Sequence, residues 1–80
     1  MPYVVYVLAC TDGSLYTGIT SDLHQRLAAH RAGTGAKYTR SHPPERIVYT
    51  QKMRSKAAAL RREHAIKQLP RKQKLELIRG

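Results

Sequence analysis

The chain has 80 residues, which is enough for one small domain over residues 1–80 and too short for a second domain or a repeat array. Its 41% hydrophobic and 25% charged residues are typical of a folded globular protein. Fifteen Lys and Arg against five Asp and Glu give a net charge of +10, and all fifteen cations lie within residues 26–80. This asymmetry predicts a polyanionic partner, DNA or RNA.

Membrane, disulfide and structural zinc chemistry are not expected. The longest apolar run, Tyr3 to Cys10, is eight residues, and a spanning helix needs roughly 20. The single cysteine cannot form an internal disulfide, which fits a reducing, cytoplasmic environment. The four histidines and this cysteine lack the paired spacing of structural zinc sites.

The N-terminal part of the chain predicts a β-hairpin. Tyr3–Cys10 is rich in β-branched and aromatic residues, which is typical of a strand buried on both faces. Residues 11–14 carry an Asp-Gly turn, and Leu15–Thr20 is the second strand-like run. Counted from the turn, Tyr6 and Tyr16 are expected to be offset neighbours on the paired strands.

A helix is expected after the hairpin, followed by a loop. Ser21 or Asp22 is the candidate N-cap, and the helix is expected to run to position 31 or 32, where Gly33 ends it. Residues 33–44 are rich in Gly, Pro, Ser and Thr, so their composition predicts a loop. The core-facing stripe of the helix is expected to be Leu23, Leu27 and His30.

The remaining chain predicts a third strand and two helices. Arg46–Gln51 is the strand, Ser55 caps a helix that runs to Leu69, and residues 75–78 suggest a short terminal helix. The order ββαβαα indicates an α+β domain, with a small three-stranded sheet flanked by helices. Five residues of the long helix are expected to face inward: Ala58, Ala59, Ala65, Ile66 and Leu69.

Three charged or titratable residues are unusual for their positions. Arg26 and His30 lie at i and i+4 beside the apolar stripe of the first helix, so they predict either a phosphate clamp or side chains that reach solvent. Glu63 falls on the inward face of the long helix, where a carboxylate needs a metal ion or a salt bridge to Arg26 or a neighbouring Lys. It is also the one acid free to hold a catalytic metal, which excludes a two-metal carboxylate cluster.

The ordered set Tyr6, Tyr16-x-Gly18, Arg26-x3-His30 and Glu63 resembles the GIY-YIG endonuclease superfamily, and most closely its short stand-alone bacterial members. The two signature tripeptides appear as Val4-Val5-Tyr6 and Tyr16-Thr17-Gly18. Ala36-Lys37-Tyr38-Thr39 matches a segment common in the stand-alone group. The resemblance covers essentially the whole chain.

The resemblance implies a metal-dependent endonuclease that hydrolyses DNA phosphodiester bonds, with a role in DNA repair or processing. No separate sequence-reading module is present, so base specificity is expected to be low. One Mg²⁺ or Mn²⁺ ion is the implied cofactor. The implied roles are metal binding for Glu63, transition-state neutralisation for Arg26, water activation or positioning for Tyr6 or Tyr16, proton relay or phosphate binding for His30, and a structural turn for Gly18.

Lys37 and Arg40, with Tyr38 beside them, are expected to be exposed loop residues that line the DNA path. Two alternatives to an independent nuclease remain open. One is a non-catalytic basic module that binds DNA or RNA, which Ile19 favours because some repair members carry a Lys there. The other is a subunit that needs a protein partner or a second copy of itself.

Overall fold

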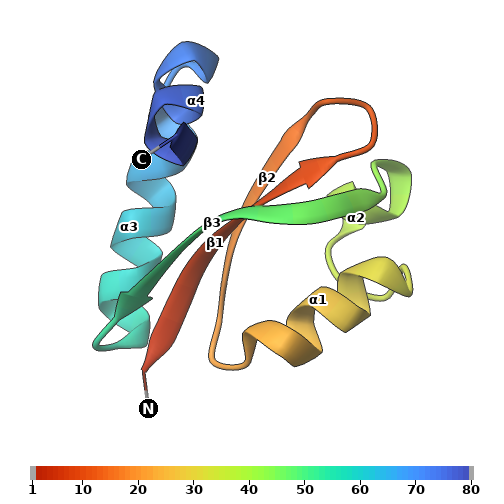
Figure 1. Cartoon of the computed structure of the whole chain (residues 1–80). Helices are drawn as coiled ribbons and strands as arrows, with labels where there is room; N and C mark the ends of the chain where they lie inside the picture. The colour runs from red at the N-terminus through yellow and green to blue at the C-terminus, as the bar shows by residue number, and fades with distance from the viewer. Residues whose placement is uncertain (1, 80) are drawn as a thin grey trace.

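Three antiparallel strands form one sheet in the computed structural model, which describes residues 2–79 (Figure 1). The sheet order is β2-β1-β3, so β1 lies at the centre and is paired on both sides. This confirms the predicted α+β fold and the order ββαβαα, with one additional short helix. The elements are β1 (Tyr3–Cys10), β2 (Leu15–Thr20), α1 (Leu23–Arg31), α2 (Lys37–Ser41), β3 (Pro44–Met53), α3 (Lys56–Gln68) and α4 (Arg71–Arg79).

The two faces of β1 serve different parts of the molecule. Because side chains alternate along a strand, Val5 and Val7 point to one face, where they form the hydrophobic core with Ala59 and Ile66 of α3. Tyr6 points to the opposite face, together with Gly18 of β2, its register partner. Helices α3 and α4 lie on one side of the sheet, and α1 and α2 lie on the other (Figure 1). The middle of the central strand, Val5–Leu8, is therefore buried, as its apolar sequence predicts.

Side-chain caps set the starts of the two main helices. The Asp22 carboxylate accepts a hydrogen bond from the backbone N–H of Gln25 at 3.1 Å, and the Ser55 hydroxyl accepts one from Ala58 at 3.2 Å. Gly33, with φ of 80°, follows the end of α1, where a left-handed residue lets the chain turn away. These caps confirm the predicted boundaries. No helix within residues 2–79 is both long and apolar enough to cross a membrane.

Two predictions from the sequence were wrong in this part of the chain. Residues 33–44 are not all loop, because Lys37–Ser41 forms α2 and β3 already begins at Pro44. Proline is tolerated there because it is the first residue of an edge strand, where its missing N–H breaks no central ladder. Ala65 was expected to face inward but is exposed, since α3 buries Ala59 and Ile66 and turns the neighbouring position to solvent.

Candidate active site

Two tyrosines and a histidine from three different elements meet on the α1 side of the sheet. Tyr6 of β1 and Tyr16 of β2 have ring centroids 6.3 Å apart. The His30 ring of α1 lies 5.8 Å from the ring of Tyr6 and 5.2 Å from that of Tyr16, edge-on to both. Tyr16 is paired with Leu8 and not with Tyr6, which confirms the offset register. Three of the five predicted site residues are therefore in direct contact.

Gly18 makes room for this aromatic cluster. It was assigned to a turn, and that assignment was wrong, because Gly18 lies within β2 directly opposite Tyr6. A Cβ atom added at Gly18 would lie 2.6 Å from the Tyr6 hydroxyl oxygen and 3.0 Å from Cε2 of Tyr16. Glycine at this position lets the Tyr6 and Tyr16 side chains lie close to the β2 backbone, because any larger residue would displace both tyrosine rings.

His30 is completely buried and holds a hydrogen bond at each ring nitrogen. Its Nε2 lies 2.8 Å from the Tyr6 hydroxyl, and its Nδ1 lies 2.7 Å from the Thr39 hydroxyl. The Thr39 hydroxyl donates in turn to the carbonyl of Ala36 at 2.9 Å. Gly35 packs against the same ring, and a Cβ there would lie 2.5 Å from Nδ1. Sequence reasoning gave no site role to Gly35, or to Thr39 of the matched segment Ala36–Thr39, because only the folded connection between α1 and α2 brings them to His30.

Burial and nearby charges shift the pKa values in this cluster in opposite directions. Burial raises the pKa of the Tyr6 hydroxyl above 10, and the Glu63 charge adds to that effect while Arg26 opposes it. Burial also lowers the pKa of His30 below 6.5, and the positive charge of Arg26 lowers it further. Tyr6 and His30 are consequently both uncharged at neutral pH, and Arg26 is the cation that acts on both.

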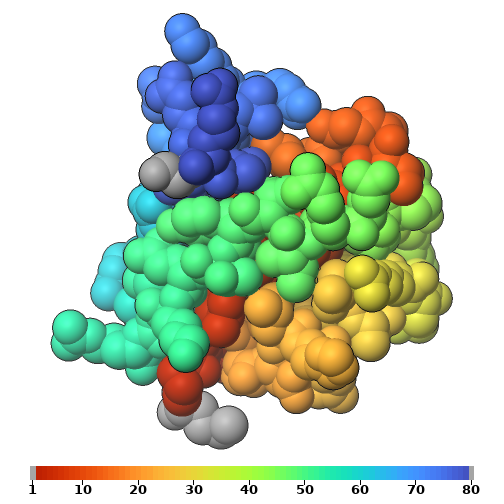
Figure 2. All heavy atoms as spheres, in the orientation of Figure 1, coloured from red at the N-terminus to blue at the C-terminus, as the bar shows by residue number. Residues whose placement is uncertain are grey.

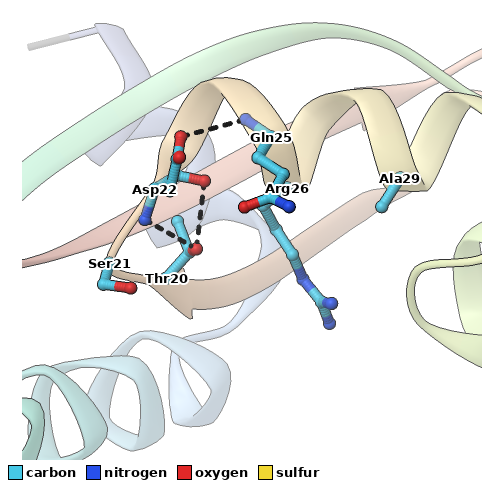
Figure 3. Close-up of a pocket in the computed structure, with 6 residues that line it drawn as sticks. All are labelled: Thr20, Ser21, Asp22, Gln25, Arg26 and Ala29. Atoms are coloured by element: carbon cyan, nitrogen blue, oxygen red, sulfur yellow. Dashed lines mark hydrogen bonds between the residues drawn. The ribbon is translucent and has the colours of Figure 1, made fainter.

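Arg26 extends from α1 at the edge of an open pocket. The pocket has a volume of about 300 Å³. Figure 3 shows the guanidinium pointing away from the Asp22 cap, so the cation is not used by the carboxylate of its own helix. An anionic group entering this space would meet the guanidinium directly. The lining residues are Thr20, Ser21, Asp22, Gln25, Arg26 and Ala29.

Glu63, on α3, is the acid that the sequence predicts to bind the metal ion. Its charge acts on the Tyr6 hydroxyl, and its side chain is 18% exposed. Its Oε2 lies 3.3 Å from Nζ of Lys67, so the salt bridge considered from the sequence is formed with the next turn of α3 and not with Arg26. Within residues 2–79 no group of three or more metal-ligating side chains occurs. One partly exposed carboxylate fits Mg²⁺, which commonly keeps several waters and takes substrate phosphate oxygens as further ligands.

Helix α2 carries the residues predicted to bind nucleic acid. Lys37, Tyr38 and Arg40 are exposed as expected, although they lie on a helix and not in a loop. The Tyr38 ring stacks on the ring of Tyr16, with centroids 5.9 Å apart, and also on the ring of His42, with centroids 4.0 Å apart. The aromatic cluster thus continues from Tyr16 to the molecular surface, with the two cations of α2 on its flank.

Two exposed residues of β3 share the sheet face of Tyr6. Thr50 is paired with Tyr6 and Lys52 with Val4, so their side chains project to the same face as the tyrosine. Figure 2 shows atoms of β1 in red between β3 in green and α1 in orange, so β1 is not fully covered along this seam. Sequence reasoning did not assign Lys52 to the site, because a third strand can be read from its composition but its register cannot.

Comparison with known proteins matches the chain over nearly its whole length. Residues 2–76 match the family described as the GIY-YIG catalytic domain. A UPF0213 protein of Natronomonas pharaonis is 50% identical over 76 residues, which cover 95% of this chain and 89% of that protein. A UPF0213 protein of Halobacterium salinarum is 53% identical over 74 residues, covering 92% and 96%.

Solved structures show the same fold. The solution NMR structure of a UPF0213 protein of Bacillus halodurans has a TM-score of 0.63 and 46% sequence identity, and the match covers 98% of this chain and 83% of that one. The NMR structure of a protein of E. faecalis gives a TM-score of 0.67 and 40% identity, covering 99% and 84%. Sequence, fold and the spacing of the clustered tyrosines agree, and the chain belongs to the GIY-YIG family, among its short UPF0213 relatives.

Proposed function

We propose that this chain is a divalent-metal-dependent endonuclease that hydrolyses phosphodiester bonds of DNA with low base specificity. The observation that carries the proposal is the position of the Arg26 guanidinium in a GIY-YIG domain. It borders an open pocket, and its positive charge lowers the pKa of Tyr6 in the aromatic cluster. A strongly basic chain, with net charge +10, suits a polyanionic substrate. DNA repair or processing in the cytoplasm is the proposed setting.

The two tyrosines are proposed to have different roles. Tyr6 is 1% exposed and its hydroxyl is hydrogen-bonded to His30. Tyr16 is half-buried, and its hydroxyl is not part of that hydrogen-bond chain. We therefore assign Tyr16 to the water side, where its oxygen can accept a hydrogen bond from the attacking water and orient it toward phosphorus. Tyr6 and His30 are proposed to hold the side chains of Tyr16 and Arg26 in position.

Arg26 and Glu63 are proposed to provide the charge stabilisation. Arg26 pairs with the non-bridging phosphate oxygens, whose negative charge grows as the pentacovalent transition state forms. Glu63 would hold one Mg²⁺ or Mn²⁺ ion together with waters and a phosphate oxygen. When bound, such an ion supplies Lewis-acid stabilisation of the leaving 3′-oxygen. In the structure the Glu63 carboxylate forms a salt bridge with Lys67 at 3.3 Å, which a bound ion would have to replace or share.

The test is a cleavage panel with the purified protein. Plasmid, single-stranded, flap and junction DNA and a matched RNA are incubated with Mg²⁺, Mn²⁺ or EDTA. We expect metal-dependent cutting of at least one DNA substrate and loss of about 100-fold or more in Arg26→Ala. The exposed Arg79→Ala is the matched control and should cut like the wild type. Cutting that is equal in EDTA, or equal in Arg26→Ala, would overturn the proposal.

A non-catalytic nucleic-acid-binding module is the second candidate. Two observations favour it: Ile19 stands where some repair members carry a cation, and Tyr6 is almost fully buried. This candidate predicts salt-dependent binding of DNA or RNA with no cleavage under any metal condition. A subunit that is active only in a complex would cut once a cell extract that contains its partner is added. A subunit that is active only as a homodimer would cut at higher protein concentration, whereas the non-catalytic module would cut in neither case.

A further inference from the structure

A continuous chain of hydrogen bonds runs from the backbone beside α2 into the candidate site. It links the Ala36 carbonyl, the Thr39 hydroxyl, the two ring nitrogens of His30 and the Tyr6 hydroxyl, with oxygen–oxygen or nitrogen–oxygen distances of 2.9, 2.7 and 2.8 Å. Tyr6, His30 and Thr39 are at most 2% exposed. Water cannot easily replace any of these partners, so the direction of each hydrogen bond is decided by the protein alone.

We propose that Thr39 is a positioning residue, which fixes His30 in the tautomer protonated at Nδ1 and so makes Nε2 the acceptor of the Tyr6 hydroxyl hydrogen. A role in cleavage rests on the function proposed above, whereas the tautomer itself does not. Thr39 lies in the segment Ala36–Thr39 that resembles the stand-alone members, but that resemblance gave it no role at the site.

The number of available hydrogens fixes the tautomer of His30. A hydroxyl has one hydrogen to donate, and that of Thr39 is used by the Ala36 carbonyl. Toward His30 the Thr39 oxygen can then only accept, so Nδ1 must carry the hydrogen. A neutral imidazole carries a single N–H, and burial keeps His30 neutral. Nε2 is therefore left with its lone pair, and the Tyr6 hydroxyl must donate to it.

One contact points the other way and is weaker. The backbone N–H of Ala36 lies 3.5 Å from Nδ1 of His30, and as a hydrogen bond it would need an unprotonated Nδ1. The Thr39 oxygen is much closer to the same nitrogen, at 2.7 Å, and hydrogen bonds weaken steeply with distance. The shorter contact decides the tautomer. The Tyr6 hydroxyl hydrogen is then used by His30, and the lone pairs of the Tyr6 oxygen are left for other partners.

The direct test determines the tautomer of His30 by long-range ¹H–¹⁵N NMR of the full chain with ¹⁵N-labelled histidine. The pH is set above the range in which histidine side chains titrate. In the wild type we expect a protonated Nδ1 and an unprotonated Nε2. The nearly isosteric Thr39→Val, which lacks the hydroxyl, should lose this pattern, and Thr39→Ser should keep it. The exposed Thr34→Val is the matched control and should resemble the wild type. Protonation at Nε2 in the wild type would overturn the proposal, whatever the variants do.

Cleavage provides the second readout. With a substrate that the wild type cuts, Thr39→Val should lower kcat by about tenfold or more with little change in KM, and Thr39→Ser should restore it. Equal kcat for Thr39→Val and wild type would overturn the positioning role. If no substrate is cut by any form of the protein, the proposed nuclease function fails, and the tautomer measured by NMR still decides the proposal about Thr39.

Discussion

A single hydrogen at Gly18 separates the backbone of β2 from two aromatic side chains. The Gly18→Ala variant adds a methyl group 2.6 Å from the Tyr6 oxygen, so Tyr6 must shift and its hydrogen bond with His30 is disturbed. We expect a loss of about 1–3 kcal/mol in the free energy of unfolding, as for other overpacked sites, and at least tenfold slower cleavage. Urea unfolding and a cleavage assay measure both. Thr11→Ala, at an exposed residue of the turn between β1 and β2, should change neither; an unchanged Gly18→Ala would show that the rings tolerate the methyl group.

Glu63 can be tested by a change that keeps its shape. Glu63→Gln removes the charge that we propose holds a divalent ion, but it preserves the volume and a polar end. We expect cleavage to fall by about 100-fold or more, while DNA affinity measured by anisotropy stays within about twofold. The exposed Glu76→Gln is the matched control. Wild-type cutting by Glu63→Gln in Mg²⁺ would show that the metal is held elsewhere.

At the scale of elements, we predict that α2 lines the path of the DNA. Its Lys37 and Arg40 are exposed beside Tyr38, whose ring stacks on Tyr16. Replacing both cations by Ala should flatten the plot of log affinity against log salt by about 1 to 2 units, because each phosphate contact contributes about 0.9. Folding should be unchanged.

The control for this experiment is a pair of the same composition on another helix. Lys72 and Arg79 of α4 are both exposed. Their replacement by Ala should leave the slope nearly unchanged if the DNA path follows α2. Anisotropy titrations at four or more salt concentrations compare the two double variants. A larger effect from the α4 pair would move the DNA path to the opposite side of the sheet.

The strongly patterned elements were predictable, and α2 was not. The Asp-Gly turn and the caps at Asp22 and Ser55 are local signals, and the structure follows them. A five-residue helix has too few residues for a periodic pattern and is too short to be stable alone. Part of its support comes from Thr39, which is bound to His30 across nine residues of sequence. Contacts of that kind become visible only after the chain is folded.

The same distinction applies to the candidate site. Tyr6, Tyr16 and His30 could be predicted because their order and spacing along the sequence match a known family pattern. The structure brings the three rings together. Gly35 and Thr39 could not, because nothing in a Gly-rich segment indicates that a histidine ring lies beneath it. Sequence spacing identifies the groups that carry chemistry, and tertiary contacts identify the groups that hold them.

At the scale of the whole molecule, the buried neutral His30 couples stability to pH. Its pKa is lowered in the folded state, so the unfolded chain binds more protons near and below pH 6.5. Stability should therefore be fully present above about pH 6.5 and decrease as the pH falls. The urea midpoint should be lower at pH 5.5 than at pH 7.5 at constant ionic strength. His64→Gln, at an exposed position of α3, should keep this difference; an equal or higher midpoint at pH 5.5 would contradict it.

The central strand has an evolutionary consequence. In β1 one set of alternate residues builds the hydrophobic core and the other set carries Tyr6. A substitution at one position affects one face, but an insertion or deletion of a single residue exchanges the two faces along the rest of the strand. Tyrosine would then enter the core and valine would face α1, so folding and chemistry would be lost together. Change in this segment should therefore accumulate by replacement, and length variation among relatives should fall outside β1, for example in the turn that follows it.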